Sequence, residues 1–357
     1  MPRSKAAGTS SKTVDRAAAA DSATTASLAV SPEHSARGRA AVLSKRLLDP
    51  LPEPARLGLA IALSFVLDLA GQALLTWATN DELANIARRA ESKTEIAVWA
   101  VWKIFGLALG WLCGYDGYDL AALAFLSAGP AAYLTSVFYG VRLVTAGGYL
   151  ALDAVSASLP FFLLRKVSGP HSAAPNVTNR EIVVDRGIQI LTSLLAGFVY
   201  SIVLFLASRT YLPNTLVLHF EGILTIRPAV DAVFLGLENP TTQILCLLFG
   251  IAARTFVFTP LVTTPRTAEE EKEIAEFDPV RATLGQTVAF NLWGFTNQTK
   301  VSIKRTAVVM ASTAISTYLR CALAINGIDS YGAGVYASVW VTAALMTGLS
   351  LRYVGSA

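Results

Sequence analysis

Charged residues are scarce in this chain of 357 residues. Asp, Glu, Lys and Arg together make up 15% of it, whereas about a quarter is usual for a soluble domain. Hydrophobic residues reach 53%, and they occur in long blocks rather than in short alternating runs. A composition of this kind excludes an ordinary soluble domain and predicts that most of the chain is embedded in a membrane.

Cysteine and histidine are also rare. The three cysteines, Cys113, Cys246 and Cys321, are odd in number and scattered through apolar stretches, so we expect buried free thiols rather than a disulfide framework. With three histidines in the whole chain, a histidine-rich metal site is not expected. The sequence predicts neither a metal nor another cofactor.

Enzyme and nucleic-acid signatures are missing. The chain has no His-Glu-x-x-His, Gly-x-Ser-x-Gly, P-loop or Gly-x-Gly-x-x-Gly motif, so no catalytic residue is predicted. Its formal charge of +4 is modest, and the bases are not clustered as nucleic-acid binding requires. A membrane-embedded enzyme stays open, because such enzymes can use sparse acidic or histidine motifs.

The apolar blocks predict an all-α, multi-pass transmembrane protein with about eight spans, because about 20 apolar residues cross the hydrocarbon core. Residues 1–56, rich in Ala, Ser, Thr, Arg and Lys, are expected to form a disordered cytosolic tail. An organelle transit peptide is the alternative for this tail, although its acidic residues argue against it. The expected spans are 57–77, 96–115, 120–140, 143–164, 187–207, 241–262, 306–325 and 331–351.

Several connections need interpretation. Residues 120–164 are too long for one span, and we expect Gly129-Pro130 to interrupt the first of two spans that join at Arg142 or at Gly147-Gly148. Just before them, Asp116 and Asp119 are interpreted as part of a solvated tight turn, with cation binding as the alternative.

Two longer connections are expected to be structured. The 208–240 segment is predicted to be an outer cap, with β-prone runs at 216–220 and 223–226 and a short helix from Pro228. Residues 263–305 are predicted to be a cytosolic loop with an acidic piece and an interfacial helix. The apolar residues of that interfacial helix are Leu284, Val288, Leu292, Trp293 and Phe295.

The distribution of bases predicts the orientation. With eight spans and both termini in the cytosol, the inner loops carry more Lys and Arg than the outer loops, as the positive-inside rule expects. An endomembrane or the plasma membrane is favoured over a mitochondrial membrane. The prediction depends on residues 120–164 forming two spans.

A polar stripe marks the first span. Ser64, Asp68, Gln72 and Thr76 recur every four residues, so on a helix they share one face. A carboxylate within the bilayer is costly, and this stripe is expected to face protein or a wet cavity. Lys103 lies at a similar depth in the second span, and we predict that it pairs with Asp68 and fixes the register of the two helices. The alternatives are a pair that couples protons or ions, and a Lys103 that extends to the membrane interface.

A second intramembrane set comprises Asp153, Arg254 and Arg320. Its two bases and one acid lie at comparable depths, which leaves either a structural pairing of Asp153 with one arginine or a net positive site for an anionic ligand or lipid head group. In the outer cap, His219, Glu221, Arg227 and Asp231 are candidates for a solute vestibule, with a plain folded loop as the alternative.

Close helix contact is predicted at Gly106, Gly110 and Gly114, whose small-xxx-small spacing lets another helix approach. Oligomerisation through these glycines and contact with membrane lipids are the expected interactions.

Three functional classes follow. The first is a structural or organising membrane protein, the second a small-solute or ion transporter that uses the buried charges, and the third a membrane-embedded enzyme. Paired charges in a dry core favour the first class, and a water-filled route to Asp68 or Asp153 favours the second.

Overall fold

The computed structural model describes residues 52–88, 92–172, 178–232, 240–268, 270, 272, 276–277, 281–292 and 296–356. Of the predicted cytosolic tail, residues 1–51 lie outside this part of the chain, as does most of the acidic piece within 263–305. The chain divides into two units, Met1–Arg56 and Leu57–Ala357. The second unit contains every helix described below, apart from the first turn of α3.

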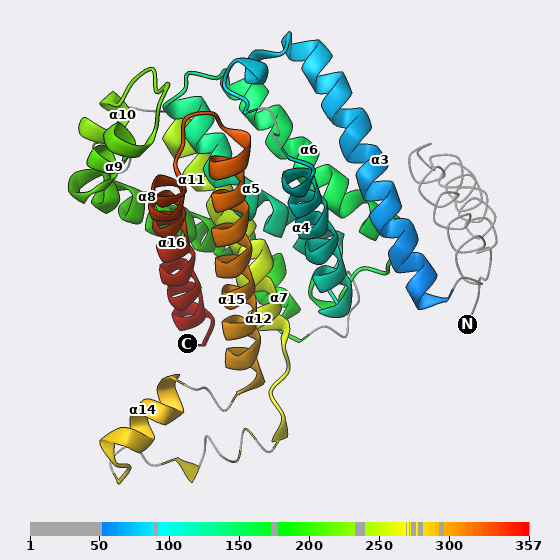
Figure 1. The fold of residues 1–357 in the computed structure, drawn as a ribbon. Helices are drawn as coiled ribbons and strands as arrows, with labels where there is room; N and C mark the ends of the chain where they lie inside the picture. The colour runs from blue at the N-terminus through cyan, green and yellow to red at the C-terminus, as the bar shows by residue number, and fades with distance from the viewer. Residues whose placement is uncertain are drawn as a thin grey trace, which may run out of the picture. The chain divides into compact units, whose positions relative to one another are not determined.

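The described residues form helices and no β-strand, which confirms the predicted all-α class. Eight helices are long and apolar enough to cross a membrane, and they run roughly alongside one another (Figure 1). They are α3 (Glu53–Thr79), α4 (Lys93–Leu112), α5 (Gly117–Val137), α6 (Leu143–Leu164), α8 (Arg186–Thr210), the continuous rod of α11 (Pro240–Ala253), η4 (Arg254–Phe258) and α12 (Thr259–Thr263), then α15 (Asn297–Leu319) with η5 (Arg320–Ala324), and α16 (Ser330–Ser356).

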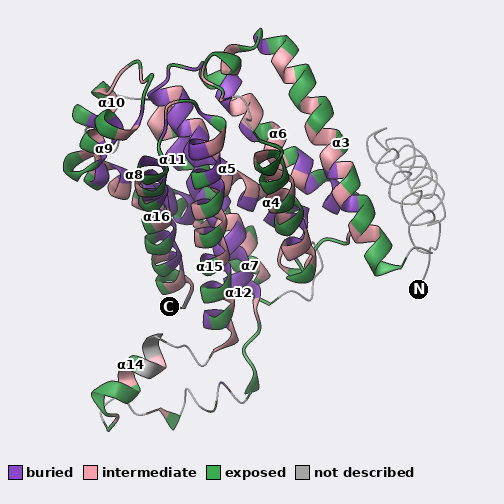
Figure 2. Ribbon diagram, in the orientation of Figure 1, coloured by how far each residue is buried: buried purple, intermediate pink, exposed green. Residues whose placement is uncertain are grey.

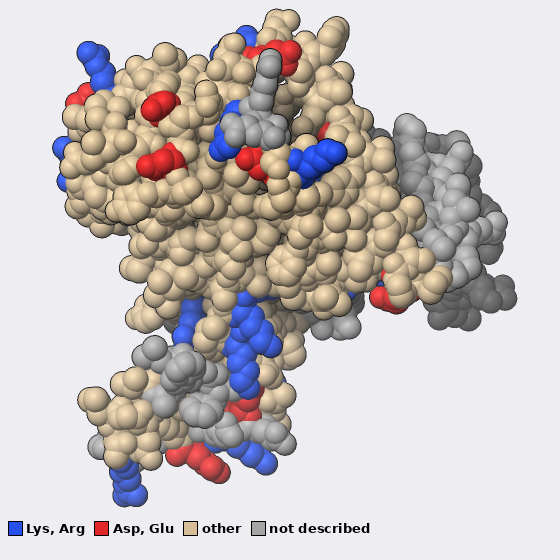
Figure 3. Space-filling view, viewed as in Figure 1, with Lys and Arg blue, Asp and Glu red and all other residues tan. Residues whose placement is uncertain are grey.

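Shorter elements lie between the eight. They are η1 (Glu82–Asn85), η2 (Gly169–His171), α7 (Arg180–Val184), α9 (Leu212–His219), α10 (Arg227–Val230) and α14 (Leu284–Leu292). Figure 3 shows a broad belt without Lys, Arg, Asp or Glu atoms across the visible face, with charged atoms gathered above and below it. A belt of this kind is compatible with a bilayer around the helices.

The core is aromatic. The rings of Tyr200 on α8, Phe249 on α11 and Trp340 on α16 are fully buried, and the Phe249 centroid lies 4.9 Å from that of Tyr200 and 5.0 Å from that of Trp340. Glycines let α8 and α11 approach closely. A Cβ atom at Gly250 would lie 2.1 Å from the carbonyl oxygen of Ser193, so only glycine fits there.

Helices α3 and α4 are peripheral. Within the most apolar windows, 11% of residues are buried in each of them, against 67% in α5 and in the α11–α12 rod, and Figure 2 shows both as mostly pink and green. The exposed side chains are large and apolar, as lipid contact requires. They include Val66, Leu69, Leu74, Ile96 and Val101.

The prediction that Gly129-Pro130 interrupts a span is wrong, because α5 continues through both residues. Proline leaves the carbonyl four residues earlier without its helical donor, and here the Thr313 hydroxyl donates to that carbonyl, on Leu126, over 3.4 Å. The junction of the two spans lies at residues 138–142, where Gly140 adopts a φ of +70°.

The segment predicted to be an outer cap is helical rather than β-like in its described part. Residues 212–219 form α9, and Phe220 takes part only in an isolated bridge to Ile328. The predicted β-prone runs are therefore wrong, because Leu212 and Leu216 share a buried helical face and packing overrides intrinsic β-propensity. The short helix predicted from Pro228 is α10, and residues 233–239 lie outside the described part of the chain.

The seventh span begins earlier than predicted. Helix α15 starts at Asn297, so Lys300, Lys304 and Arg305 belong to a helix rather than to the predicted loop. Two caps explain this start, because the Thr299 amide donates to the Thr296 hydroxyl over 3.3 Å and the Asn297 amide donates to the Glu270 carboxylate over 2.7 Å. The predicted interfacial helix corresponds to α14, while Trp293 and Phe295 lie outside the described residues.

Candidate polar site at the start of α5

Asp116 and Asp119 cap the N-terminus of α5. The Asp116 carboxylate accepts a hydrogen bond from the Asp119 amide over 2.9 Å, and the Asp119 carboxylate accepts one from the Asp116 amide over 3.4 Å. The pair forms a capping box, and both residues are buried. The interpretation of a solvated turn is therefore wrong, because helix-end amides and further donors replace water.

Arg305 supplies the further donors to Asp119. Its guanidinium donates to both oxygens of Asp119, over 2.5 and 3.1 Å, and lies against the rings of Tyr115 and Phe256 at 4.8 and 4.9 Å from their centroids. The two-pronged contact matches guanidinium geometry, and it balances a charge that would be costly if left alone. Burial raises the pKa of the neighbouring Tyr115 hydroxyl to about 12, so it stays protonated at neutral pH.

The Arg305 guanidinium also satisfies a backbone carbonyl that lacks its helical hydrogen bond. Pro260 has no N–H group, so the carbonyl of Phe256, four residues earlier, lacks its α-helical donor. Arg305 donates to that carbonyl over 2.8 Å. The segment Arg254–Phe258 is wound as a π turn, in which the Thr259 amide bonds the Arg254 carbonyl. Turns of this kind often occur at functional sites.

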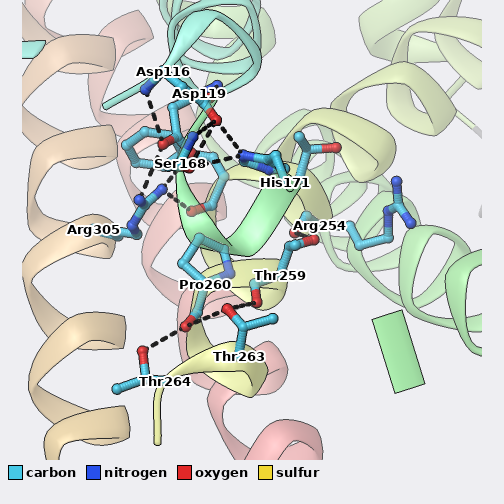
Figure 4. A network of polar contacts seen from close by, with 12 residues as sticks. Asp116, Asp119, Ser168, His171, Arg254, Thr259, Pro260, Thr263, Thr264 and Arg305 are labelled. Atoms are coloured by element: carbon cyan, nitrogen blue, oxygen red, sulfur yellow. Dashed lines mark hydrogen bonds and ion pairs between the residues drawn. The ribbon is translucent and has the colours of Figure 1, made fainter. Parts of the chain in front are cut away.

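Asp116 connects α5 to the loop after α6. Its Oδ2 atom accepts hydrogen bonds from the Ser168 amide and hydroxyl over 3.0 and 2.7 Å, and lies 2.9 Å from His171 Nδ1 (Figure 4). Burial alone raises the pKa of Asp116, but the hydrogen bonds from His171, the Asp119 amide and Ser168 outweigh it. The net pKa lies well below the usual range, so Asp116 is ionised at neutral pH.

Asp116, Asp119 and His171 also hold potential ligand atoms within 4.8 Å of one another. Both oxygens of Asp119 nevertheless accept from Arg305, a permanent cation. A divalent ion in the same place would have to displace or oppose that guanidinium. The arrangement therefore fits a network of charge-assisted hydrogen bonds better than a metal centre.

A partly open cavity of about 390 Å³ adjoins this network. Arg180, His171 and Arg254 line it, together with Gln189 of α8 and with apolar or hydroxyl-bearing residues from α5, η2, α7, η4 and α12. Figure 4 shows the Arg254 side chain extending away from the Asp119–Arg305 network. Arg254 has no hydrogen-bond or ion-pair partner for its side chain among the described residues, and its Nε atom is buried.

The predicted intramembrane charges are brought together in pairs. Lys103 Nζ lies 2.7 Å from the Asp68 carboxylate and 3.4 Å from the Ser156 hydroxyl, and Arg320 pairs with Asp153. These contacts agree with the predicted pairing of Asp68 with Lys103 and of Asp153 with one arginine. A functional role for the four residues stays a prediction.

The rest of the polar stripe on α3 is mixed. Ser64 is fully buried and its hydroxyl has no partner among the described residues, while the Thr76 hydroxyl bonds Tyr149 over 3.0 Å. Gln72 is exposed, so the stripe does not face protein along its whole length.

The outer-cap candidates do not form one site. His219 Nδ1 lies 2.7 Å from the Asp329 carboxylate at the start of α16, whereas Glu221, Arg227 and Asp231 are exposed. Backbone contacts dock the segment, since the Glu221 amide donates to the Gly327 carbonyl over 2.7 Å.

The three glycines near α4 are in different surroundings. Gly106 has open space where a Cβ atom would stand, whereas Gly110 packs against Leu120 of the same chain. Gly114 follows the end of α4 and has a φ of +78°. Oligomerisation through them stays a prediction.

No protein-family model, curated protein sequence or solved structure matches this chain significantly.

Sequence reasoning missed Ser168, His171 and Arg305. One signal was present, because Asp116-x-x-Asp119 before an apolar run has the spacing of a capping box. Arg305 follows Lys300 and Lys304 closely, so the three bases together were typical of a cytosolic loop end. Nothing in the local sequence distinguishes His171 from an ordinary loop histidine.

Proposed function

We propose that the protein is a structural or organising component of a membrane, in which buried charges fix the packing of its helices. The carrying observation is that Asp68, Asp119 and Asp153 each pair with a base on another helix. An acid that binds and releases a coupling ion has to be free during part of each cycle. Buried pairs instead suit a role in helix register.

The pairs matter most for α3 and α4, which bury little surface against the bundle. Lys103 joins α4 to Asp68 on α3 and to Ser156 on α6. The Trp102 indole on α4 also donates to the Ser316 hydroxyl on α15 over 2.9 Å. These polar contacts attach two lipid-facing helices to a well-packed core, and we infer that the exposed face of α3 and α4 is the surface offered to lipids.

The proposed topology places both termini in the cytosol and residues 208–240 outside, in an endomembrane or the plasma membrane. An even number of crossings returns the chain to the side from which it entered. The bases Arg165, Lys166, Lys300 and Lys304 all fall on the proposed inner side, in agreement with the positive-inside rule.

A small-solute or ion transporter is the second candidate, and the cavity at Arg254 favours it. Arg254 is the one base among the predicted intramembrane candidates that lacks a partner in the described part of the chain. The membrane-enzyme class gains no support from the outer cap, where the candidate side chains are not brought together.

A mutant cycle tests the structural proposal. Asp68→Asn and Lys103→Met should each lower the free energy of unfolding by about 3 kcal/mol, because each leaves one charge unpaired. The double variant should recover part of this loss, with a coupling of about 0.5–3 kcal/mol. Thermal unfolding in detergent measures both values, and Lys93→Met, at an exposed position on the same helix, should change little.

Flux measurements on the protein reconstituted in proteoliposomes distinguish the structural proposal from the transporter proposal. In proteoliposomes, the structural proposal expects a proton or solute flux no greater than that of empty vesicles. A flux that Asp68→Asn abolishes while thermal stability is kept would reject the proposal in favour of a transporter.

A further inference from the structure

We propose that the cavity beside Arg254 binds a phosphate group, carried either by a lipid head group or by a soluble phosphomonoester. The cavity lies among η2, α7, the first turns of α8 and the π turn η4. It is separate from the Asp68 and Asp153 pairs. The argument rests on two side chains with unpaired buried nitrogen atoms, on the local charge and on the size of the cavity.

Arg254 is the first unpaired group. It is half-buried within an apolar helix, and buried charges in proteins are normally paired. The other predicted intramembrane charges follow this rule, because Lys103 pairs with Asp68 and Arg320 pairs with Asp153. Arg254 has no counter-ion among the described residues, and its buried Nε atom has no hydrogen-bond partner there. An anion from outside the chain would supply both.

His171 is the second unpaired group. Its side chain is 10% exposed, and its Nδ1 atom is held by Asp116. The Nε2 atom is buried and has no partner among the described residues, although the residue lines the cavity. An imidazole fixed in this way can meet a protonated phosphate oxygen as an acceptor, or an ionised one as a donor when it is doubly protonated.

Charge and size favour phosphate over a simple carboxylate. Arg180 lines the cavity and has no side-chain partner in the described part of the chain, and none of the described lining residues is Asp or Glu. Two guanidinium groups therefore line the same cavity. A doubly charged phosphomonoester neutralises both of them, whereas a carboxylate leaves one guanidinium without a counter-charge. The volume of about 390 Å³ accommodates a small ligand.

The backbone keeps Arg254 in this position. The π turn that begins at Arg254 is held at Phe256 by the hydrogen bond from Arg305. Asp119 in turn fixes Arg305, and Asp116 fixes His171 from the other side. The imidazole of His171 and the backbone turn that carries Arg254 are therefore both held by residues of the Asp116–Asp119–Arg305 network, shown in Figure 4, as a pre-formed binding site requires.

Thermal unfolding with two probes tests the proposal. Inorganic phosphate is titrated into the detergent-solubilised protein at constant ionic strength, and the protein is compared in phosphatidylcholine nanodiscs with and without phosphatidic acid. Either probe should raise the melting temperature in a saturable way, because a ligand that binds the folded state stabilises it. A response to phosphate indicates a soluble ligand, and a response to phosphatidic acid alone indicates a lipid.

Variants make the test specific. Arg254→Gln should abolish the ligand-induced shift and, without ligand, should match or exceed the wild-type melting temperature, because it removes an unpaired charge. Arg180→Gln should weaken phosphate binding about tenfold, as the loss of one charge-assisted hydrogen bond does. Arg186→Gln removes an exposed arginine outside the cavity lining, and it should keep the full shift.

Three results would overturn the inference: no saturable shift with either probe, a shift that Arg254→Gln retains, or an equal loss in Arg186→Gln. If Arg254→Gln fails to fold, Arg254→Lys and Arg180→Gln decide, and unchanged affinity in both counts against the site. Asp68→Asn should leave phosphate binding intact, so the outcome is independent of the structural proposal.

Discussion

The Arg305 guanidinium donates a hydrogen bond over 2.8 Å to the carbonyl of Phe256, whose helical donor position is occupied by Pro260. Arg305 therefore performs two tasks, since it also neutralises Asp119. One side chain of α15 thus satisfies a carbonyl that has no helical donor in η4 and neutralises the carboxylate of Asp119 at the start of α5. Phe256, which accepts this hydrogen bond, lies within the π turn that begins at Arg254.

Coupling between Arg305 and Pro260 is the first prediction. Arg305→Lys should destabilise the protein by about 2 kcal/mol, because one ammonium group cannot reach both Asp119 oxygens and the carbonyl. In a Pro260→Ala background the restored backbone N–H can serve Phe256, and the cost of Arg305→Lys should fall by at least about 0.5 kcal/mol. Thermal unfolding of the four proteins measures this, and strict additivity would contradict the shared role.

Close packing of α8 and α11 gives the second prediction. Gly250→Ala should destabilise the protein by about 1–3 kcal/mol, because its Cβ atom would meet the Ser193 carbonyl and the Gly197 backbone. Gly106→Ala is the matched control, since no atom lies within 4 Å of its Cβ position. The control should be neutral or stabilising by up to about 1 kcal/mol from helix propensity. Equal effects of the two substitutions on the melting temperature would argue against this packing.

The third prediction is that the stability of the fold depends on pH through Glu82, whose carboxylate contacts the N-terminus of α6. Its carboxylate accepts hydrogen bonds from the Thr145 hydroxyl and from the Arg142 amide and guanidinium. The Thr145 contact, followed by those from Arg142, lowers the pKa of Glu82 from 4.5 to about 2. A lowered pKa means that the ionised form stabilises the fold above the unfolded pKa and that this stabilisation is lost as the pH falls.

The wild type should therefore melt at a higher temperature than Glu82→Gln at neutral pH, and the difference should shrink as the pH falls from about 4.5 towards 2. Thr145→Val, which removes the strongest donor, should reduce the same pH-dependent difference. A gap between wild type and Glu82→Gln that stays constant over this range would show that the carboxylate charge is not involved.

The number of long apolar helices could be predicted from the sequence, because about twenty apolar residues in a row leave few alternatives to a span. The Asp68–Lys103 contact was also predictable, since both residues lie on polar or small faces of consecutive spans at matching depth. Pairing at equal depth is a strong constraint when charge in lipid is expensive.

Asp119 and Arg305 were not predictable in the same way. They are 186 positions apart, and each lies next to residues of its own polarity at the end of a span, where water is the expected partner. Their burial depends on how α5, α12 and α15 pack together, which no local pattern encodes. The β-prone runs at 216–220 and 223–226 failed for a related reason, because the bundle beneath α9 decides which backbone conformation buries its leucines.

The position of Arg305 in the chain has a consequence for biosynthesis. Translation delivers Asp119, Leu126 and Phe256 before the α15 residues that serve them. A nascent chain that ends after α12 lacks the Arg305 and Thr313 donors to the Asp119 carboxylate and to the Phe256 and Leu126 carbonyls, and these contacts can form only after α15 has been synthesised.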